Sequence, residues 1–309
     1  MSGTIAGYIL DTATGELLFT PQVTLTRTGV AGESLTQADE LGRFAFRSLT
    51  PGGYNLGIYD DRYVPLYRDL ILEEGTSIED LRISLTPAAF IKGQILDEDG
   101  VPPQHCHFTL IRAGNRRGKS GYISDSGDHA VDKDGHFASP PLRPGRYCLR
   151  FAGVLRKHFI APQTTPWAMQ ERIFDFVYPN VQDVVDAVFF DLEMGQTLDH
   201  IEVRIPRPIW RTVRGRLTGA LPDNLADTYV HFARDVGMID DFGSMGVKVD
   251  SLGAFEGPAQ PGRYRLFVWE MTPPDQDGYT QRKREFSSAE VTVGAHDTVG
   301  VEIQITGYN

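Results

Sequence analysis

Apolar residues separated by one position recur between short turns that are rich in glycine and proline. Leu81, Ile83 and Leu85 alternate with polar residues in this way, and comparable triplets recur later in the chain. A period of two is typical of a strand with one buried face, whereas an amphipathic helix repeats its apolar positions every three or four residues. The pattern therefore predicts an all-β protein.

A punctuated motif appears three times and divides the chain. Each copy joins an Asp-x-x-Gly-x-Phe turn to a Pro-Gly-x-Tyr-x-Leu strand. The copies are Asp39-Glu-Leu-Gly42-Arg-Phe44 with Pro51-Gly52-Gly-Tyr54-Asn-Leu56, Asp132-Lys-Asp-Gly135-His-Phe137 with Pro144-Gly145-Arg-Tyr147-Cys-Leu149, and Asp250-Ser-Leu-Gly253-Ala-Phe255 with Pro261-Gly262-Arg-Tyr264-Arg-Leu266. Short strands with regular turn signals are typical of β-sandwiches. The repeat predicts three antiparallel β-sandwich domains at 3–86, 88–206 and 208–306.

Turn chemistry explains why these residue types recur. An aspartate side chain can accept hydrogen bonds from nearby backbone amides, and a glycine three residues later accepts a positive φ. Each copy also follows an opening strand that contains a glycine, at Gly7, Gly93 and Gly215. One helix is predicted, over 166–176, because Pro166 suits a first helical turn.

In these motifs the chain resembles tandem carboxypeptidase regulatory-like domains, which are small transthyretin-like sandwiches related to collagen-binding B-type modules. The resemblance covers nearly the whole chain. It implies an accessory, spacing or binding module beside enzymes, receptors or envelope proteins, and some related sandwiches bind carbohydrate. Tyr178-Pro179-Asn180 also resembles longer members found in bacterial envelope proteins. Because one fold serves many functions, the resemblance specifies the fold more closely than the role.

Composition and charge exclude several classes of protein. Thirty basic against 41 acidic residues give a net charge of −11, which disfavours binding to nucleic acid. No apolar run approaches the roughly 18 residues that cross a bilayer, so membrane insertion is not expected. The start, Met1-Ser2-Gly3-Thr4-Ile5, has no charged leader before an apolar stretch. A cytoplasmic protein and an envelope protein whose leader was removed both fit.

The main catalytic alternative is a degenerate intradiol dioxygenase. These ring-cleaving enzymes share a related sandwich and a similar Pro-Gly-x-Tyr strand, in which the tyrosine binds ferric iron beside a second tyrosine and a His-x-His pair. Only His105-Cys106-His107 has that spacing, and it precedes Tyr147 instead of following it. Tyr54, Tyr147 and Tyr264 alternate with leucines. Core tyrosines, and neither a metal site nor a cofactor, are therefore expected.

The sequence gives even less support to a zinc peptidase site, an isopeptide bond or a calcium site. No histidine is followed by glutamate three positions later, so the zinc carboxypeptidase pair is missing. An isopeptide bond would need Lys92 or Lys248 beside an aligned asparagine, which no closing strand supplies. Acidic turns that could hold calcium are found at Asp97-Glu98-Asp99, Asp125 with Asp128, Asp132 with Asp134, and Asp240-Asp241, but none completes the usual loop. We expect solvated turns and no enzymatic activity.

The two cysteines, Cys106 and Cys148, allow at most one disulfide. Alternation along the strands places Cys106 on the inward face and Cys148, between Tyr147 and Leu149, on the outward face. Side chains on opposite faces cannot reach the short Cβ separation of a disulfide. Two free thiols are predicted.

A ligand site, if present, is expected in the long insert from Gly153 to Asp191 of the middle domain. Aromatic and basic residues there could stack on a sugar or anchor a protein partner; they are Arg156, Trp167, Phe174, Phe176 and Tyr178. They could equally cover the edge of the sandwich or attach it to a neighbour. The sequence as a whole predicts a non-enzymatic spacer or binding module, with a carbohydrate or another envelope protein as the partner.

Overall fold

The computed structural model describes residues 2–103, 105–116, 119–125, 127–155, 176–205, 209–221, 225–235, 245–272 and 282–305. Within these ranges the chain forms strands and one 3-10 helix, η1 (Val184–Asp186), so the fold is all-β as predicted. The helix predicted over 166–176 lies outside the described residues except for Phe176, which begins strand β14 (Phe176–Val177). In the described part of the chain, no helix has the length and apolar character needed to span a membrane.

The chain divides into two compact units. Unit one comprises Met1–Gln94, Asp134–Tyr147 and Phe190–Glu202, and unit two comprises Ile95–Lys133, Cys148–Phe189 and Val203–Asn309. Residues of the predicted middle domain, 88–206, thus contribute to both units. The three domain boundaries stay a prediction that unfolding experiments can test.

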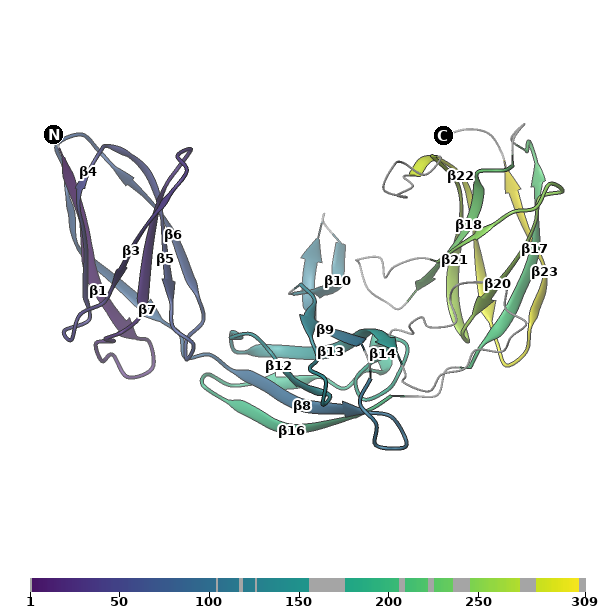
Figure 1. Ribbon diagram of the computed structural model, residues 1–309, viewed down its shortest axis with the longest axis horizontal. Helices are drawn as coiled ribbons and strands as arrows, with labels where there is room; N and C mark the ends of the chain where they lie inside the picture. Colours follow the sequence, from purple (N-terminus) through teal and green to yellow (C-terminus); the bar gives the residue numbers. More distant parts are fainter. Residues whose placement is uncertain are drawn as a thin grey trace. The chain divides into compact units, whose positions relative to one another are not determined.

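Two sheets make up the N-terminal sandwich, which lies in unit one. Its strands are β1 (Gly3–Asp11), β2 (Gln22–Arg27), β3 (Glu33–Gln37), β4 (Arg43–Leu49), β5 (Gly52–Tyr59), β6 (Leu66–Leu72) and β7 (Ile78–Leu85). One sheet has the order β4-β1-β7 and the other β3-β2-β5-β6. Figure 1 draws these strands in purple and blue. β1 is antiparallel to β4 but parallel to β7, whereas the second sheet is antiparallel throughout. Residues of both sheets, among them Ile9, Leu25 and Leu56, form one buried core.

The C-terminal sandwich, in unit two, has the same arrangement. Its strands are β17 (Arg211–Gly219), β18 (Thr228–Asp235), β19 (Met245–Lys248), β20 (Ala254–Ala259), β21 (Gly262–Met271), β22 (Arg282–Val293) and β23 (Thr298–Ile305). The two sheets have the orders β20-β17-β23 and β19-β18-β21-β22. Here too the opening strand, β17, is antiparallel to β20 and parallel to β23. Val230, Leu266 and Ile303 belong to its core.

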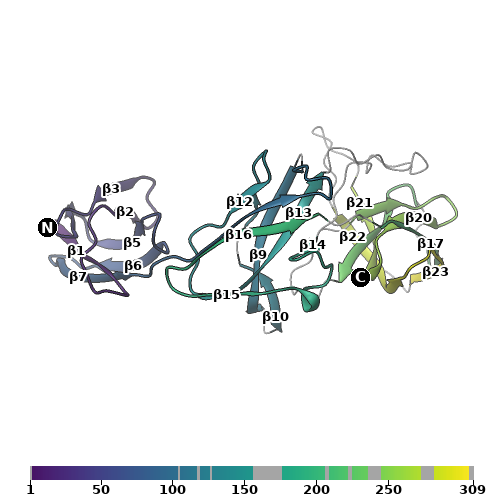
Figure 2. The same ribbon diagram turned by 90° about the horizontal axis from the view of Figure 1, so that it is seen from below.

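The middle strands form two further sheets. They are β8 (Phe90–Leu96), β9 (His105–Arg116), β10 (Lys119–Ser124), β11 (His129–Ala130), β12 (His136–Ala138), β13 (Gly145–Leu155), β14, β15 (Phe190–Leu192) and β16 (Thr197–Arg204). A three-stranded sheet has the order β12-β8-β16. A six-stranded sheet has the order β10-β9-β13-β14, with β11 beside β9 and β15 beside β13. Figure 2 shows β9 and β13 as its two long neighbouring strands.

Strand order therefore recurs with the sequence motif. In each three-stranded sheet the opening strand lies between the strand after the Asp-x-x-Gly turn and the closing strand. The same steric contact explains why each opening strand contains a glycine. A Cβ at Gly7 would lie 2.0 Å from the carbonyl oxygen of Leu81, and Gly93 and Gly215 meet the closing strand at 2.1 and 2.3 Å. A side chain at these positions would push the closing strand away.

The predicted aspartate turns are present. Asp39 accepts hydrogen bonds from the amides of Leu41 and Arg43 at 2.9 and 2.8 Å. Asp250 does the same for two amides in the C-terminal sandwich, both at 2.8 Å. Gly253 has a φ of 78°, the left-handed conformation that this turn requires of its glycine.

Candidate functional site

The three motif tyrosines bond to their own turns. The Tyr54 hydroxyl donates to the carbonyl oxygen of Thr50 at 2.7 Å, and the Tyr147 hydroxyl donates to that of Arg143 at 3.1 Å. In the C-terminal sandwich the amide of Gln260 donates to the Tyr264 hydroxyl at 3.0 Å. All three rings are buried. Each tyrosine thus closes a turn that begins four residues upstream, and the prediction of core tyrosines is confirmed.

In both terminal sandwiches an arginine side chain donates a hydrogen bond to the Pro-Gly turn before the motif tyrosine. This contact was not predicted from the sequence. Arg27 donates to the carbonyl oxygen of Pro51 at 2.9 Å, and Arg234 donates to that of Pro261 at 2.6 Å. A Cβ at Gly262 would lie 2.8 Å from the Arg234 guanidinium, so the glycine makes room for it. The arginine lies 24 residues before the proline in the N-terminal sandwich and 27 residues before it in the C-terminal one, so no fixed spacing in the sequence marks the contact.

The run His105-Cys106-His107 lies at the start of β9. Both histidines lie on β9 with exposed side chains, while Cys106 between them is buried. Among the described residues no three His, Cys, Asp or Glu side chains come close enough together to hold a metal ion. Of the acidic turns, Asp97 accepts hydrogen bonds from two amides of its own turn, and Asp125 pairs with Arg112.

Both cysteines are free and buried. Sequence alternation predicted that Cys148 lies on the outward face of β13. In the structure other residues of the chain cover that face, so the side chain is buried. Cys148 packs with Ile111, Val177 and Val184 in a small cluster of its own. Burial raises the pKa of its thiol to about 12, so it stays protonated and unreactive at neutral pH. The cover comes from the end of the long insert.

The predicted ligand residues of the insert are only partly described. Arg156, Trp167 and Phe174 lie outside the described residues, so their role stays a prediction. Phe176 is fully buried and stacks on Phe151 with ring centroids 5.3 Å apart. Tyr178 is half-buried beside the Cys148 cluster. The described part of the insert therefore packs on the six-stranded sheet, as the alternative interpretation expected.

The same segment contacts the C-terminal sandwich within unit two. Gln182 donates to the Gln260 side chain at 3.0 Å and accepts from Arg234. Asp183, which also caps η1, pairs with Arg263 at 3.3 Å. Gln260 is only 3% exposed, so this polar contact is shielded from water. The insert attaches neighbouring parts of the chain to each other.

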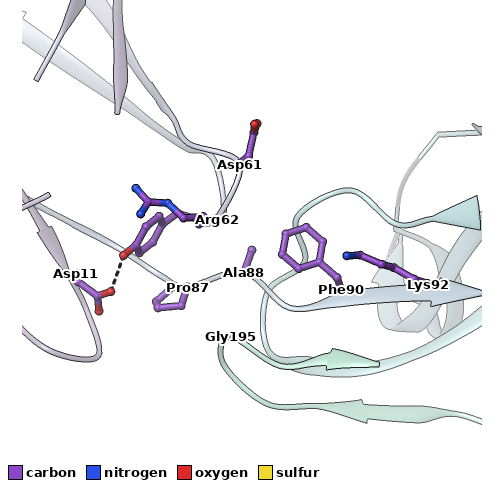
Figure 3. Close-up of a pocket in the computed structure, with 9 residues that line it drawn as sticks. Asp11, Asp61, Arg62, Pro87, Ala88, Phe90, Lys92 and Gly195 are labelled. Atoms are coloured by element: carbon purple, nitrogen blue, oxygen red, sulfur yellow. Dashed lines mark hydrogen bonds between the residues drawn. The ribbon is translucent and has the colours of Figure 1, made fainter. Parts of the chain in front are cut away.

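A depression of about 560 Å³ lies in unit one, between the end of β1 and the start of β8 (Figure 3). Its lining consists of Asp11, Asp61, Arg62, Tyr63, Pro87, Ala88, Phe90, Lys92 and Gly195. Figure 3 shows Asp11 on one side and Phe90 and Lys92 on the other. The Lys92 ammonium lies 5.8 Å from the centre of the Phe90 ring. Sequence reasoning had not selected this group.

Three polar side chains of the depression, Asp11, Arg62 and Tyr63, have hydrogen-bond partners. The Tyr63 hydroxyl donates to Asp11 at 2.6 Å, and Arg62 makes two hydrogen bonds to Asp60 at 2.9 and 2.8 Å. Burial, together with the Asp11 hydrogen bond, raises the pKa of Tyr63 to about 12. Burial alone would raise the pKa of Asp11, but hydrogen bonds from Tyr63, Thr14 and Ala13 bring it below its ordinary value.

This arrangement fits a structural contact between two segments of the chain better than a catalytic centre. Tyr63 stays protonated and Asp11 ionised at neutral pH, so neither is poised for proton transfer near pH 7. The amide of Ala88 donates to the carbonyl oxygen of Arg62 at 2.8 Å, and that of Val64 donates to Thr86 at 2.9 Å. The depression therefore lies where the loop after β5 is fastened to the segment that enters β8.

No protein-family model matches the chain, and a search of curated proteins gives no match. Solved structures with a similar backbone include the TIE protein of Bacillus anthracis, with 12% identity, 100% of this chain and 51% of that protein covered, and a TM-score of 0.25. A streptococcal ancillary pilin has 15% identity, 99% coverage of both chains and a TM-score of 0.28. Chlorocatechol 1,2-dioxygenase from Pseudomonas putida has 12% identity, 27% and 59% coverage and a TM-score of 0.23. The chain spans about half the length of the TIE protein. At these values the similarities say nothing about function.

Proposed function

We propose that this chain is a non-enzymatic array of three transthyretin-like modules, similar to carboxypeptidase regulatory-like domains, that acts as a spacer or binding module of a cell envelope. The observation that supports this function is how the motif residues are used. Tyr54, Tyr147 and Tyr264 bond within their own turns, and Asp39 and Asp250 hold the turns beside them. The side chains that recur in the chain therefore serve its fold.

The dioxygenase-like alternative requires a tyrosine that can give up its proton to iron. Burial raises the pKa of Tyr264, which opposes the phenolate form. Iron would also need imidazole ligands, and the exposed pair His105 and His107 lies on either side of a buried cysteine. The arrangement thus disfavours an iron centre at the motif tyrosines.

A metal analysis of the purified protein, combined with a visible absorption scan, tests the proposal against this alternative. We expect substoichiometric iron after incubation with ferric salt and no band from charge transfer between tyrosinate and iron. One iron per chain accompanied by such a band would contradict the non-enzymatic function.

The envelope association is tested separately. We expect an antibody against the chain to detect it in the envelope fraction of the source cells. Recovery in the soluble interior fraction alone, beside a clean envelope marker, would rule out an envelope role.

Carbohydrate binding is the second candidate function, because one sheet of the C-terminal sandwich carries four partly exposed aromatic side chains on its outer face. These are Tyr229, His231, Phe267 and Trp269. Flat rings on a rigid sheet can bind the apolar face of a sugar with little loss of side-chain freedom.

A further inference from the structure

The outer face of the four-stranded sheet differs between the terminal sandwiches. In the N-terminal sandwich, Thr24 on β2 lies opposite Gly57 on β5, which is three residues after the motif tyrosine. At the matching place in the C-terminal sandwich, His231 on β18 lies opposite Phe267 on β21. Aromatic rings thus replace a small hydroxyl side chain and a glycine.

The corresponding outer face of the six-stranded sheet differs from both. Ile111 on β9 and Cys148 on β13 are covered by Val177 and Val184 from the end of the insert. An apolar outer face is therefore buried by the chain itself at one place. In the C-terminal sandwich the equivalent face keeps its rings partly exposed.

Four rings form one continuous platform, defined as Tyr229, His231, Phe267 and Trp269. His231 lies against Trp269 with ring centroids 4.1 Å apart, and Phe267 stacks on Trp269 at 5.7 Å and 28°. Tyr229 follows His231 at 6.3 Å. Strand geometry makes such a two-by-two array about 7 Å long and 5 Å wide. That is the scale of one or two sugar rings.

Neighbouring residues hold two of the platform rings in place. The Trp269 indole N–H donates to Glu285 at 3.2 Å, which sets the orientation of the ring. Gly246 lies across from His231 on β19, and a Cβ there would come within 2.7 Å of the imidazole. Burial lowers the pKa of His231 to about 4, so its imidazole is uncharged at neutral pH.

Hydrogen-bonding groups surround the rings. Lys248 lies opposite Tyr229 on β19, and Ser288 lies opposite Phe267 on β22. Both side chains are exposed, and Glu285 lies beside Trp269. An ammonium, a hydroxyl and a carboxylate can together donate to and accept from the hydroxyl groups of a sugar.

We propose that the platform is a binding site for a neutral polysaccharide, with the apolar face of a sugar ring stacked on Trp269 and Phe267. This inference rests on the proposed binding function and names its ligand class and site. A stable protein interface needs roughly 800 Å² on each partner, far more than four half-buried rings supply. The net charge of −11 and the neighbouring Glu285 disfavour nucleic acid.

Native affinity electrophoresis of the full chain tests the site, with laminarin, xylan, mannan and mixed-linkage glucan each cast into the gel. We expect at least one polysaccharide to retard the chain. Trp269→Ala should weaken the retardation at least about tenfold, because the largest ring of the platform is lost. Trp269→Phe should keep part of it, since a ring remains.

Tyr67→Ala is the matched control, because Tyr67 is 62% exposed on β6 of the N-terminal sandwich. It should leave retardation unchanged, and thermal melting should show every variant to be folded. If Trp269→Ala fails to fold, Phe267→Ala replaces it with the same expected loss.

The outcomes separate the site from the proposed function. Retardation that survives loss of the Trp269 and Phe267 rings would overturn the platform while leaving a binding module. Retardation by none of the four polysaccharides would overturn the carbohydrate inference, and the metal analysis would still decide between module and enzyme.

Discussion

At Tyr147 one side chain serves both packing and turn closure. Its ring is 4% exposed, and its hydroxyl donates to the carbonyl oxygen of Arg143. Tyr147→Ala should destabilise the protein by roughly 3 to 5 kcal/mol, as loss of a large buried ring does. Tyr147→Phe keeps the ring and should cost only about 1 kcal/mol for the hydrogen bond. Urea unfolding measures both, and equal costs would show that the hydroxyl dominates.

His231 should make stability depend on pH. Burial lowers its pKa in the folded protein to about 4, from an ordinary value of 6.5. As pH falls, the unfolded chain therefore takes up the proton first. The contribution of neutral His231 is complete above about pH 6.5 and is lost progressively toward pH 4.

Melting temperatures of the wild type and of His231→Phe, measured between pH 7 and pH 4, test this prediction. The variant should lose less stability on acidification than the wild type, because residue 231 no longer titrates. Parallel curves for the two proteins would mean that burial does not perturb this imidazole.

At the scale of elements, the opening-strand glycine should be needed in each three-stranded sheet. A Cβ at Gly215 would meet the carbonyl oxygen of Val301 at 2.3 Å and the ring of Phe255 at 2.4 Å. Gly215→Ala should cost about 1 to 3 kcal/mol, as overpacking does.

Gly294→Ala is the control in the same sandwich, because a Cβ at Gly294 would meet nothing within 4 Å. It should change the free energy of unfolding by less than about 1 kcal/mol. Chemical denaturation compares the two variants directly. Similar effects would mean that the contact with the closing strand does not explain the glycine.

Local rules made the strands and turns predictable. The spacing from Asp39 to Gly42 and from Pro51 to Tyr54 specifies turn chemistry that depends only on nearby atoms. Alternation along β13 likewise gave the direction of Cys148. Local rules could not predict which side chains cover Cys148, because Val177 and Val184 lie far from it in the sequence.

The platform of aromatic rings was likewise not predictable from local sequence rules. Trp269 follows the motif tyrosine by an odd number of residues, so its outward direction could have been read from the sequence. An aromatic residue in a strand is ordinarily assigned to the core, and the partner that makes it notable, His231, lies on another strand. The contact across strands depends on register, which a single strand does not disclose.

At the scale of the whole molecule, the two terminal sandwiches should unfold as separate entities. The core of the N-terminal sandwich lies wholly in unit one, and that of the C-terminal sandwich lies wholly in unit two. Leu56 and Leu266 occupy the same place in their motifs, and both are 0% exposed. They form a matched pair of probes.

Leu56→Ala and Leu266→Ala should each destabilise one sandwich by roughly 2 to 5 kcal/mol. Because neither core contains residues of the other unit, each substitution should lower a different calorimetric transition of the full chain and leave the other in place. Middle strands contribute to both units, so their transition should follow one or both sandwiches. If either variant shifts the entire profile to lower temperature, the chain unfolds as one cooperative structure, and the independence expected of separate modules does not hold.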